Sequence, residues 1–281
     1  MTRFHHTLLA PIPNMTISSG LHLFAEAITF AVLLGVLAWA ISLARRHRTA
    51  VPLLMMLGGA LTYGYEPIVD TLGKCYLPAT HQWTLFTELG RHMPVYGLFV
   101  YSAFFGGFSI MSWSHLRSGG NPKGLWKLYA IAIFINTFLF ESPAIWAHIY
   151  RYYGEQPFNL WGFPLWWPFV NTAGPIAGGA LAYVLAERTP LDRRIVLAFA
   201  VISEPLFDGF ANGAAGGPTW MAMNSGMPAV VIWLAGVLTI ALGCLIVGTA
   251  VWGLSLLESG SSPATGRQGA APPAHEPVPL L

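Results

Sequence analysis

The sequence predicts an all-α integral membrane protein, a bundle of seven transmembrane helices. Of its 281 residues, 54% are hydrophobic and only 9% are charged, whereas soluble domains carry about 25% charged residues. Seven stretches are long and apolar enough to cross a bilayer, for which about 20 residues are needed. Lysines and arginines gather in alternate loops between these stretches. Most of the surface is therefore expected to face lipid.

The predicted spans, in chain order, are residues 21–43, 50–69, 94–113, 124–146, 164–186, 194–213 and 226–256. The first six are each an apolar run of about the length that spans the hydrocarbon core. The seventh is longer than the bilayer requires, which predicts a tilt or an extension beyond the membrane. The segment after it is rich in Pro, Ala, Gly and Ser, a composition typical of disorder. We therefore expect a transmembrane domain over 1–257 and a disordered cytoplasmic tail over 258–281.

Orientation follows from the basic residues, because loops rich in Lys and Arg stay in the cytoplasm. Ten of the 14 lie in the loops after the first, third and fifth spans and in the tail. These ten are Arg45, Arg46, Arg48, Arg117, Lys123, Lys127, Arg188, Arg193, Arg194 and Arg267, and the other four are Arg3, Lys74, Arg91 and Arg151. The distribution predicts an extracytoplasmic N-terminus and a cytoplasmic C-terminus.

Acidic residues occur within or at the ends of the second, fourth and sixth spans, at Glu66, Asp70, Glu141, Glu204 and Asp208. A charge inside a bilayer costs roughly 2.5–3.5 kcal/mol on insertion scales, so such residues point to a functional site. Under the predicted orientation, all five lie in the outer third of the membrane. The second and sixth spans share the pattern E-P-x-x-D, which puts two carboxyl groups on one helical face, about 6 Å apart along the axis. The proline in each removes a backbone donor and can kink the helix.

These five acids are the predicted catalytic residues of one outward-facing pocket. Several carboxylates in one apolar site repel each other, so at least one is expected to be protonated near neutral pH and to serve as a general acid. The alternative for each is an acid at a helix end that reaches interfacial water or pairs with Lys74, Arg91 or Arg151.

A second set of residues is expected to bind the substrate. Arg91 and His92 precede Pro94, which suits the first position of the third helix and places them at the outer mouth. The aromatic segment 158–167 precedes the fifth helix, and its ring faces can stabilise a cation or form an interfacial belt. The side chains assigned to substrate are Arg91, His92, Tyr65, Asn171, Trp167 and Asn212. The alternative role of the amides and basic groups is helix packing or capping.

Several reaction classes are disfavoured by what the sequence lacks. The cytoplasmic halves of the spans hold no ionisable residue in their cores, which argues against an ion path. There is no E-x-x-H pair, aspartate-rich magnesium motif, glycine-rich phosphate loop or G-x-S-x-G. The positions of the two cysteines favour neither a disulfide nor a metal site. We expect no cofactor, no metal and no nucleic-acid partner, which leaves acid–base catalysis on a lipophilic molecule.

Four segments carry a resemblance to a known family: GYEPIVDTLG, HQWTLFTELGRHMPVYGLFVYSAFFGG, FESPAIWAHIYRYYGEQPF and GFPLWWPFVN. Together they resemble the AveC-type spirocyclase family of actinobacterial membrane proteins, over roughly residues 60–211. The resemblance implies a bacterial plasma-membrane enzyme of specialised or lipid metabolism that closes spiroketals or dehydrates its product. It does not imply a particular substrate or set of catalytic residues.

Two alternatives remain open. The first is an integral-membrane terpene cyclase that protonates an olefin or epoxide, for which Glu66 and Asp208 are suitable acids. The second is a non-catalytic seven-helix protein that binds a small molecule. In each case the expected partners are a lipophilic small molecule and membrane lipid.

Overall fold

The computed structural model describes residues 14–260, most of which are helical. Within this range, six helices are long and apolar enough to cross a membrane. They are Ser19–His47, Val95–Arg117, Gly124–Trp146, Trp167–Glu187, Arg193–Ala215 and Ala229–Ser259. This is the architecture of an all-α, multi-pass membrane protein.

A helical column is either one long helix or two shorter helices that follow each other along one path. Short irregular turns divide three of these columns into two helices each. The helices are α1 (Ser19–His47), α2 (Val51–Thr62), α3 (Glu66–Gly73), α4 (Val95–Arg117), α5 (Gly124–Phe134), α6 (Ser142–Trp146), α7 (Trp167–Glu187), α8 (Arg193–Phe210), α9 (Gly217–Asn224) and α10 (Ala229–Gly260). The 3-10 turn Tyr63–Tyr65 joins α2 to α3, and the π-helical turns Ile135–Glu141 and Ala211–Ala215 join α5 to α6 and α8 to α9. Neither α2 nor α3 alone reaches the 18 residues of a membrane span.

Each of the three breaks precedes a proline, at Pro67, Pro143 and Pro218. Proline has no N–H for the helical ladder, so the turn before it is free to tighten or widen. The predicted disturbance before Pro67 is present as the 3-10 turn. By contrast, α8 continues unbroken through Pro205, and its column breaks only at Ala211–Ala215.

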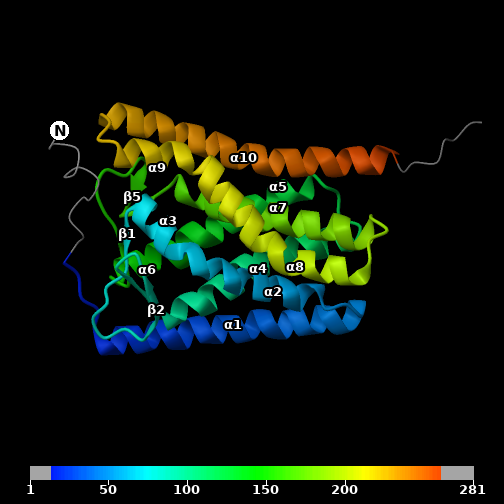
Figure 1. The fold of residues 1–281 in the computed structure, drawn as a ribbon, viewed down its shortest axis with the longest axis horizontal. Coiled ribbons are helices and arrows are strands. Elements are labelled where there is room, and N and C mark those ends of the chain that lie inside the picture. Colours follow the sequence, from blue (N-terminus) through cyan, green and yellow to red (C-terminus); the bar gives the residue numbers. More distant parts are fainter. Residues whose placement is uncertain (1–13, 261–281) are drawn as a thin grey trace, which may run out of the picture.

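Four columns form the centre of the bundle, with α2, α4, α7 and α8 each packed against two of the others. Helix α1 lies against α2 and α4, and α10 lies against α7 and α9, along opposite long sides of the molecule (Figure 1). In their most apolar windows, α7 is 67% buried and α4 is 61% buried, against 17% for α1 and 28% for α10. Helices α1 and α10 therefore present apolar side chains outward.

Three short antiparallel ribbons lie at the end of the bundle that holds α3, α6 and α9 (Figure 1). Their strands are β1 (Cys75–Tyr76) with β4 (Arg151–Tyr152), β2 (Thr84–Glu88) with β3 (Arg91–Pro94), and β5 (Asn159–Leu160) with β6 (Phe163–Pro164). The hairpin turns Leu89-Gly90 and Trp161-Gly162 have positive φ at both residues, as tight two-residue hairpins require.

These ribbons correct two predicted helix starts. Pro94 ends β3 and caps α4, which begins at Val95, and Pro164 ends β6, so α7 begins at Trp167. At the other end of the chain, α10 continues to Gly260, past the predicted start of the tail at 258. The rest of that tail, including Arg267, and the N-terminal residues with Arg3 lie outside the described residues.

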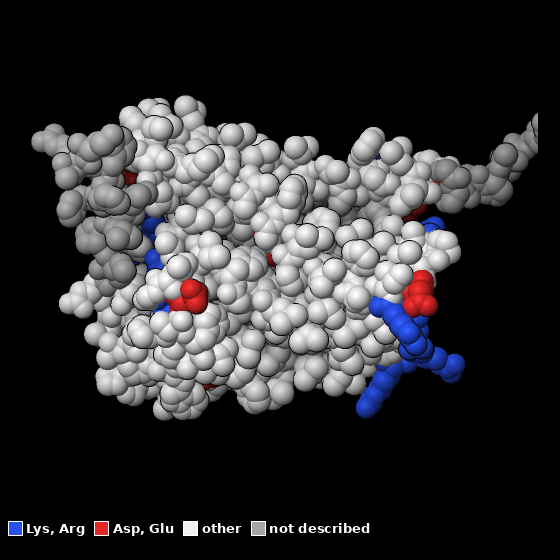
Figure 2. Space-filling model, viewed as in Figure 1, with Lys and Arg blue, Asp and Glu red and all other residues white. Residues whose placement is uncertain are grey.

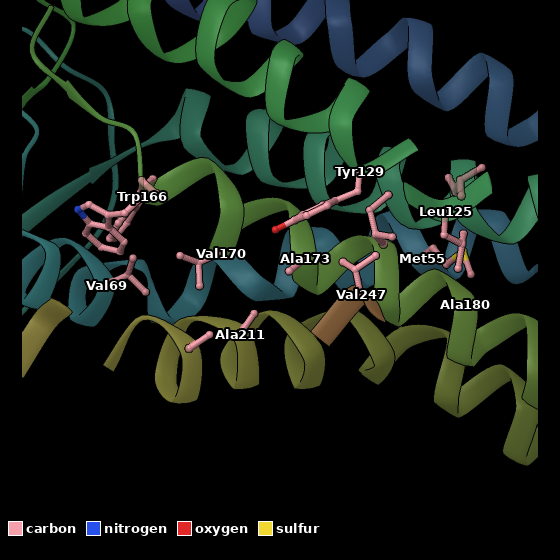
Figure 3. Close-up of a cluster of buried hydrophobic side chains, with 14 of the residues drawn as sticks. Met55, Val69, Leu125, Tyr129, Trp166, Val170, Ala173, Ala180, Ala211 and Val247 are labelled. Carbon is pink, nitrogen blue, oxygen red and sulfur yellow. The ribbon is translucent and has the colours of Figure 1, made fainter. Parts of the chain in front are cut away.

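The apolar core extends along the length of the bundle. It runs from Val69 and Trp166 at the ribbon end to Met55 and Leu125 at the other, along a row of small α7 side chains (Figure 3). On the face shown in Figure 2, charged side chains gather toward the two ends of the long axis, and the surface between them is nearly free of charge. This distribution is what a bilayer-spanning surface requires.

Candidate functional site

A small cavity lies beneath the ribbons, and two of the predicted catalytic acids, Glu66 and Glu141, line it. Its volume is about 80 Å³, enough for several waters or for the polar end of a larger molecule. Its remaining wall is largely aromatic and comes from α4, α7 and the segments beside the ribbons. These aromatic residues are Tyr63, Tyr96, Tyr101, Phe104, Phe105, Phe140, Tyr150, Tyr152 and Trp167.

Glu66 opens α3, directly after the 3-10 turn that precedes Pro67. Its Oε2 accepts a hydrogen bond from the Tyr101 hydroxyl of α4. Asp70 follows one turn later and interacts with Glu66, but it does not line the cavity. It is 1% exposed, and within the described chain its Oδ2 has no hydrogen-bond partner. The E-P-x-x-D motif therefore gives the cavity one acid and places the second behind it.

Glu141 ends the π-helical turn Ile135–Glu141. In a π-helix, residues five apart lie on one face, so Asn136 and Glu141 both reach the cavity. Two phenols donate to Glu141 Oε2, Tyr150 at 2.6 Å and Tyr152 at 3.3 Å. Burial raises the pKa of both tyrosines well above the usual value, so both remain protonated donors.

The ribbons hold these phenols in place. Pairing of β1 with β4 sets Tyr152 opposite Cys75, and both side chains line the cavity. Arg91 secures β1 from behind: its guanidinium donates to Thr71 Oγ1 at 2.8 Å, to the Cys75 carbonyl and to the Tyr153 hydroxyl at 3.1 Å. Arg91 therefore donates to three acceptors within the protein, and it does not line the cavity.

The predicted grouping of Arg91 with His92 at the mouth is wrong, because successive residues of a strand point to opposite faces. Arg91 is buried, whereas His92 is exposed and contacts Thr87 Oγ1 through Nδ1 at 3.2 Å across the hairpin. Among the other predicted binding residues, Trp167 and Asn171 line the cavity, one turn apart on α7. Tyr65 and Asn212 do not line it.

Glu204 and Asp208 form a second acidic group, outside this cavity. They pack against α7, where Gly178 and Gly174 leave room for them. Glu204 also lies against Gly58 of α2. Gly58 is eight residues before Glu66, which corresponds to about 12 Å along the helical column at 1.5 Å per residue. The structure thus separates Glu204 from Glu66 along the bundle axis. The sixth predicted span ends at residue 213, but its helical column continues to Asn224, so Glu204 lies farther from the end of that column than predicted.

The Ser109 hydroxyl contacts both the Glu204 carboxyl group and a backbone carbonyl of α7. Its Oγ lies 3.0 Å from the Pro175 carbonyl and also contacts Glu204 Oε2. A hydroxyl has one proton to donate, and a carbonyl oxygen can only accept. Either Ser109 shares its proton between the two acceptors, or Ser109 donates to Pro175 while a protonated Glu204 donates to Ser109. The second arrangement predicts a protonated Glu204, which can be tested by substitution.

Sequence reasoning missed Tyr101, Tyr150, Tyr152 and Asn136. Tyrosines are common at membrane interfaces, so those of VYGLFVYS and HIYRYYG gave no specific signal. Asn136 is a polar residue inside an apolar helix, five residues before Glu141, and that feature was visible in the sequence.

Within residues 14–260, no group of three or more His, Cys, Asp or Glu side chains could hold a metal ion. The chain matches no family model, no curated protein and no solved structure. The resemblance to the AveC-type family therefore stays a prediction, and the site must be interpreted from its own geometry. That geometry offers two carboxyl groups, an amide pair and an aromatic wall around one small cavity.

Proposed function

We propose that this chain is a membrane-embedded acid–base enzyme, a cyclase or dehydratase for a lipophilic substrate. The observation that carries the proposal is that Glu66 and Glu141, from different helical columns, line one small aromatic-walled cavity. A general acid and a general base facing one substrate suffice for cyclisation and dehydration.

In this proposal the chain spans the bacterial plasma membrane seven times. The column of α2 and α3 is the span added to the six long helices, and it is the second in chain order. The N-terminus is extracytoplasmic and the C-terminus cytoplasmic. The predicted cytoplasmic loops are rich in Lys and Arg, and they lie at the bundle end away from the ribbons (Figure 1). The cavity then opens in the outer half of the membrane.

The two acids differ in their neighbours, which supports different roles. Glu141 accepts from two phenols, donors suited to hold a negative charge, so it acts as the base. Glu66 has one phenol donor and interacts with Asp70, so it shares space with a second acidic group and acts as the acid. Asn136 and Asn171 orient substrate oxygens.

The reaction closest to the family resemblance is spiroketal closure of a dihydroxy ketone. One hydroxyl adds to the ketone to form a hemiketal, and Glu66 protonates the hemiketal oxygen, which leaves as water. Ring faces such as those of Phe104 and Trp167 stabilise the oxocarbenium ion. The second hydroxyl then attacks carbon, and Glu141 takes its proton. The products are the spiroketal and one water.

The test is a product assay on membranes containing the wild-type chain, Glu66→Gln or Glu141→Gln. Dihydroxy-ketone polyketides and linear polyprenyl epoxides are supplied, and products are read by mass spectrometry. Removing a general acid or base is expected to lower turnover by about 10²–10⁴-fold. Glu155→Gln, the same change at an exposed loop residue, is the matched control.

The product skeleton selects the reaction. A spiroketal or its dehydrated form supports the proposed cyclase, and a carbocycle from the epoxide supports a terpene cyclase. Turnover that survives both Glu66→Gln and Glu141→Gln would overturn the assigned site. No turnover by well-folded protein would favour a small-molecule binder.

A further inference from the structure

A long apolar groove lies beside the cavity on the outside of the bundle. It runs between α1, α4 and the column of α5 and α6, and its volume is about 610 Å³. Phe24, Ile28 and Val32 of α1 contribute to one wall, and Leu139 and Ala144 to the other. Four of these are apolar side chains 48–64% exposed, so in a membrane the groove faces the lipid chains.

The groove is as long as a lipid tail. It extends from Phe24 to Trp39 on α1 and from Tyr96 to Met111 on α4. Each stretch covers fifteen residue steps, or about 22 Å at 1.5 Å per residue. That length is most of the roughly 30 Å hydrocarbon core, and it runs along the helices, as the tails of bilayer lipids do.

The groove and the catalytic cavity share a wall. Tyr96, Val100, Phe104, Phe140 and Tyr150 line both. Phe104 and Phe140 belong to this shared wall, with ring centroids 6.1 Å apart, so aromatic side chains separate the groove from the cavity that holds Glu66 and Glu141. We expect rotamer changes at these rings to connect the two spaces.

The lining of the cavity indicates the chemistry of the polar end of a molecule whose tail would lie in the groove. Among the described residues that line it, two are acidic and none is Lys or Arg. Arg91, which lies behind β1, already donates to three acceptors. An anionic head group would meet carboxyl groups with no cation to offset it, whereas hydroxyl and carbonyl oxygens would meet acids and amides.

We infer that the substrate is an uncharged, oxygen-bearing amphiphile with a long hydrocarbon tail. It enters sideways from the bilayer, with its tail in the groove and its hydroxyl or carbonyl end between Glu66 and Glu141. This inference rests on the proposed function for the reaction itself, but the binding mode can be tested without turnover.

A second groove of the same volume, about 610 Å³, provides a control. It lies between α7, α8 and α10 and is equally apolar, with Ala214 and Leu245 among its lining residues. None of its lining residues lines the cavity. Lipid tails in general should occupy both grooves, whereas the inferred substrate should select the first.

The experiment uses the full chain in lipid nanodiscs and a C16 alcohol with a mid-chain diazirine and a terminal alkyne. The C16 fatty acid with the same diazirine and alkyne is the anionic comparison. After irradiation, labelled peptides are mapped by mass spectrometry. We expect the alcohol to label α1 and α4 around the first groove at least fivefold more than the second. The fatty acid should show no such preference.

Two variants test the assignment further. Ala144→Trp, which fills the first groove, should remove the preferential labelling, and Ala214→Trp in the second groove should leave it unchanged. Equal labelling of both grooves in the wild type would overturn the inference, even if Ala144→Trp does not fold. Glu66→Gln separates the two proposals: preserved labelling with lost turnover supports both. Preferential labelling with turnover that survives the acid variants contradicts only the catalytic assignment.

Discussion

Replacing Glu204 by Gln tests whether this buried carboxyl group carries a proton. Glu204 is 0% exposed, and its Oε2 contacts Ser109, whose Oγ is 3.0 Å from the Pro175 carbonyl. If Glu204 is the donor to Ser109, a Gln side-chain N–H can take the place of the acid O–H. The free energy of unfolding should then change by less than about 1 kcal/mol.

Ser109→Ala is the informative contrast. It removes both contacts of the Ser109 hydroxyl and leaves the Glu204 proton without an acceptor. Hydrogen bonds between membrane helices average about 0.6 kcal/mol each, and an unsatisfied buried donor costs about 1–3 kcal/mol. The expected loss is therefore about 2–4 kcal/mol, larger than that for Glu204→Gln.

Two measurements check this reasoning on purified protein. Unfolding in mixed micelles gives the free energies of the two variants. Infrared difference spectra of Glu204→Gln against wild type should show the loss of one protonated-carboxyl C=O stretch. The protonation argument is wrong if Glu204→Gln is as destabilising as Ser109→Ala, or if no such band disappears.

Three further predictions concern packing, anchoring and reactivity. Gly59→Ala should lower the free energy of unfolding by about 1–3 kcal/mol through overpacking, because the new Cβ would meet the backbone of α4. The control Gly64→Ala places its Cβ in open space and should leave thermal unfolding nearly unchanged. Arg91→Lys should lower the unfolding free energy by about 2 kcal/mol, since one ammonium group cannot reach the three acceptors that the guanidinium group binds. The control Arg151→Lys, at an exposed position, should leave the unfolding free energy unchanged. Burial raises the pKa of the Cys75 thiol well above its usual value, so maleimide should label Cys75 rapidly only after unfolding, with native labelling rising at strongly alkaline pH as thiolate forms.

Each of these predictions has a result that contradicts it. Equal stability of Gly59→Ala and Gly64→Ala would refute the close approach of α2 and α4. A neutral Arg91→Lys would mean that the guanidinium does not anchor β1. Fast labelling of Cys75 in native protein at pH 7 would show that the cavity is open to water.

The sequence made the site partly predictable because an acid in an apolar helix is a strong local signal. Glu66 and Glu141 were identified in this way, and the structure brings both to one cavity. Their partners were not identified. Tyr152 lies in β4 and Tyr150 directly precedes it, and both reach Glu141, but β4 is held by β1, a contact between distant segments. The helical bundle followed from apolar runs, but the ribbons did not, because their strands are two to five residues long.

The two copies of E-P-x-x-D show why a local motif does not fix chemistry. After Glu66 the helix ends at Gly73, so the acid lies one to two turns below the ribbons and faces the cavity. After Glu204 the helical column continues for twenty residues to Asn224, which leaves that acid buried deep against α7. The first glutamate of the motif thus lines a small cavity in one helix, and in the other it is buried against glycines of neighbouring helices. The position at which each helix ends, rather than the motif, therefore determines which of the two glutamates lines the cavity.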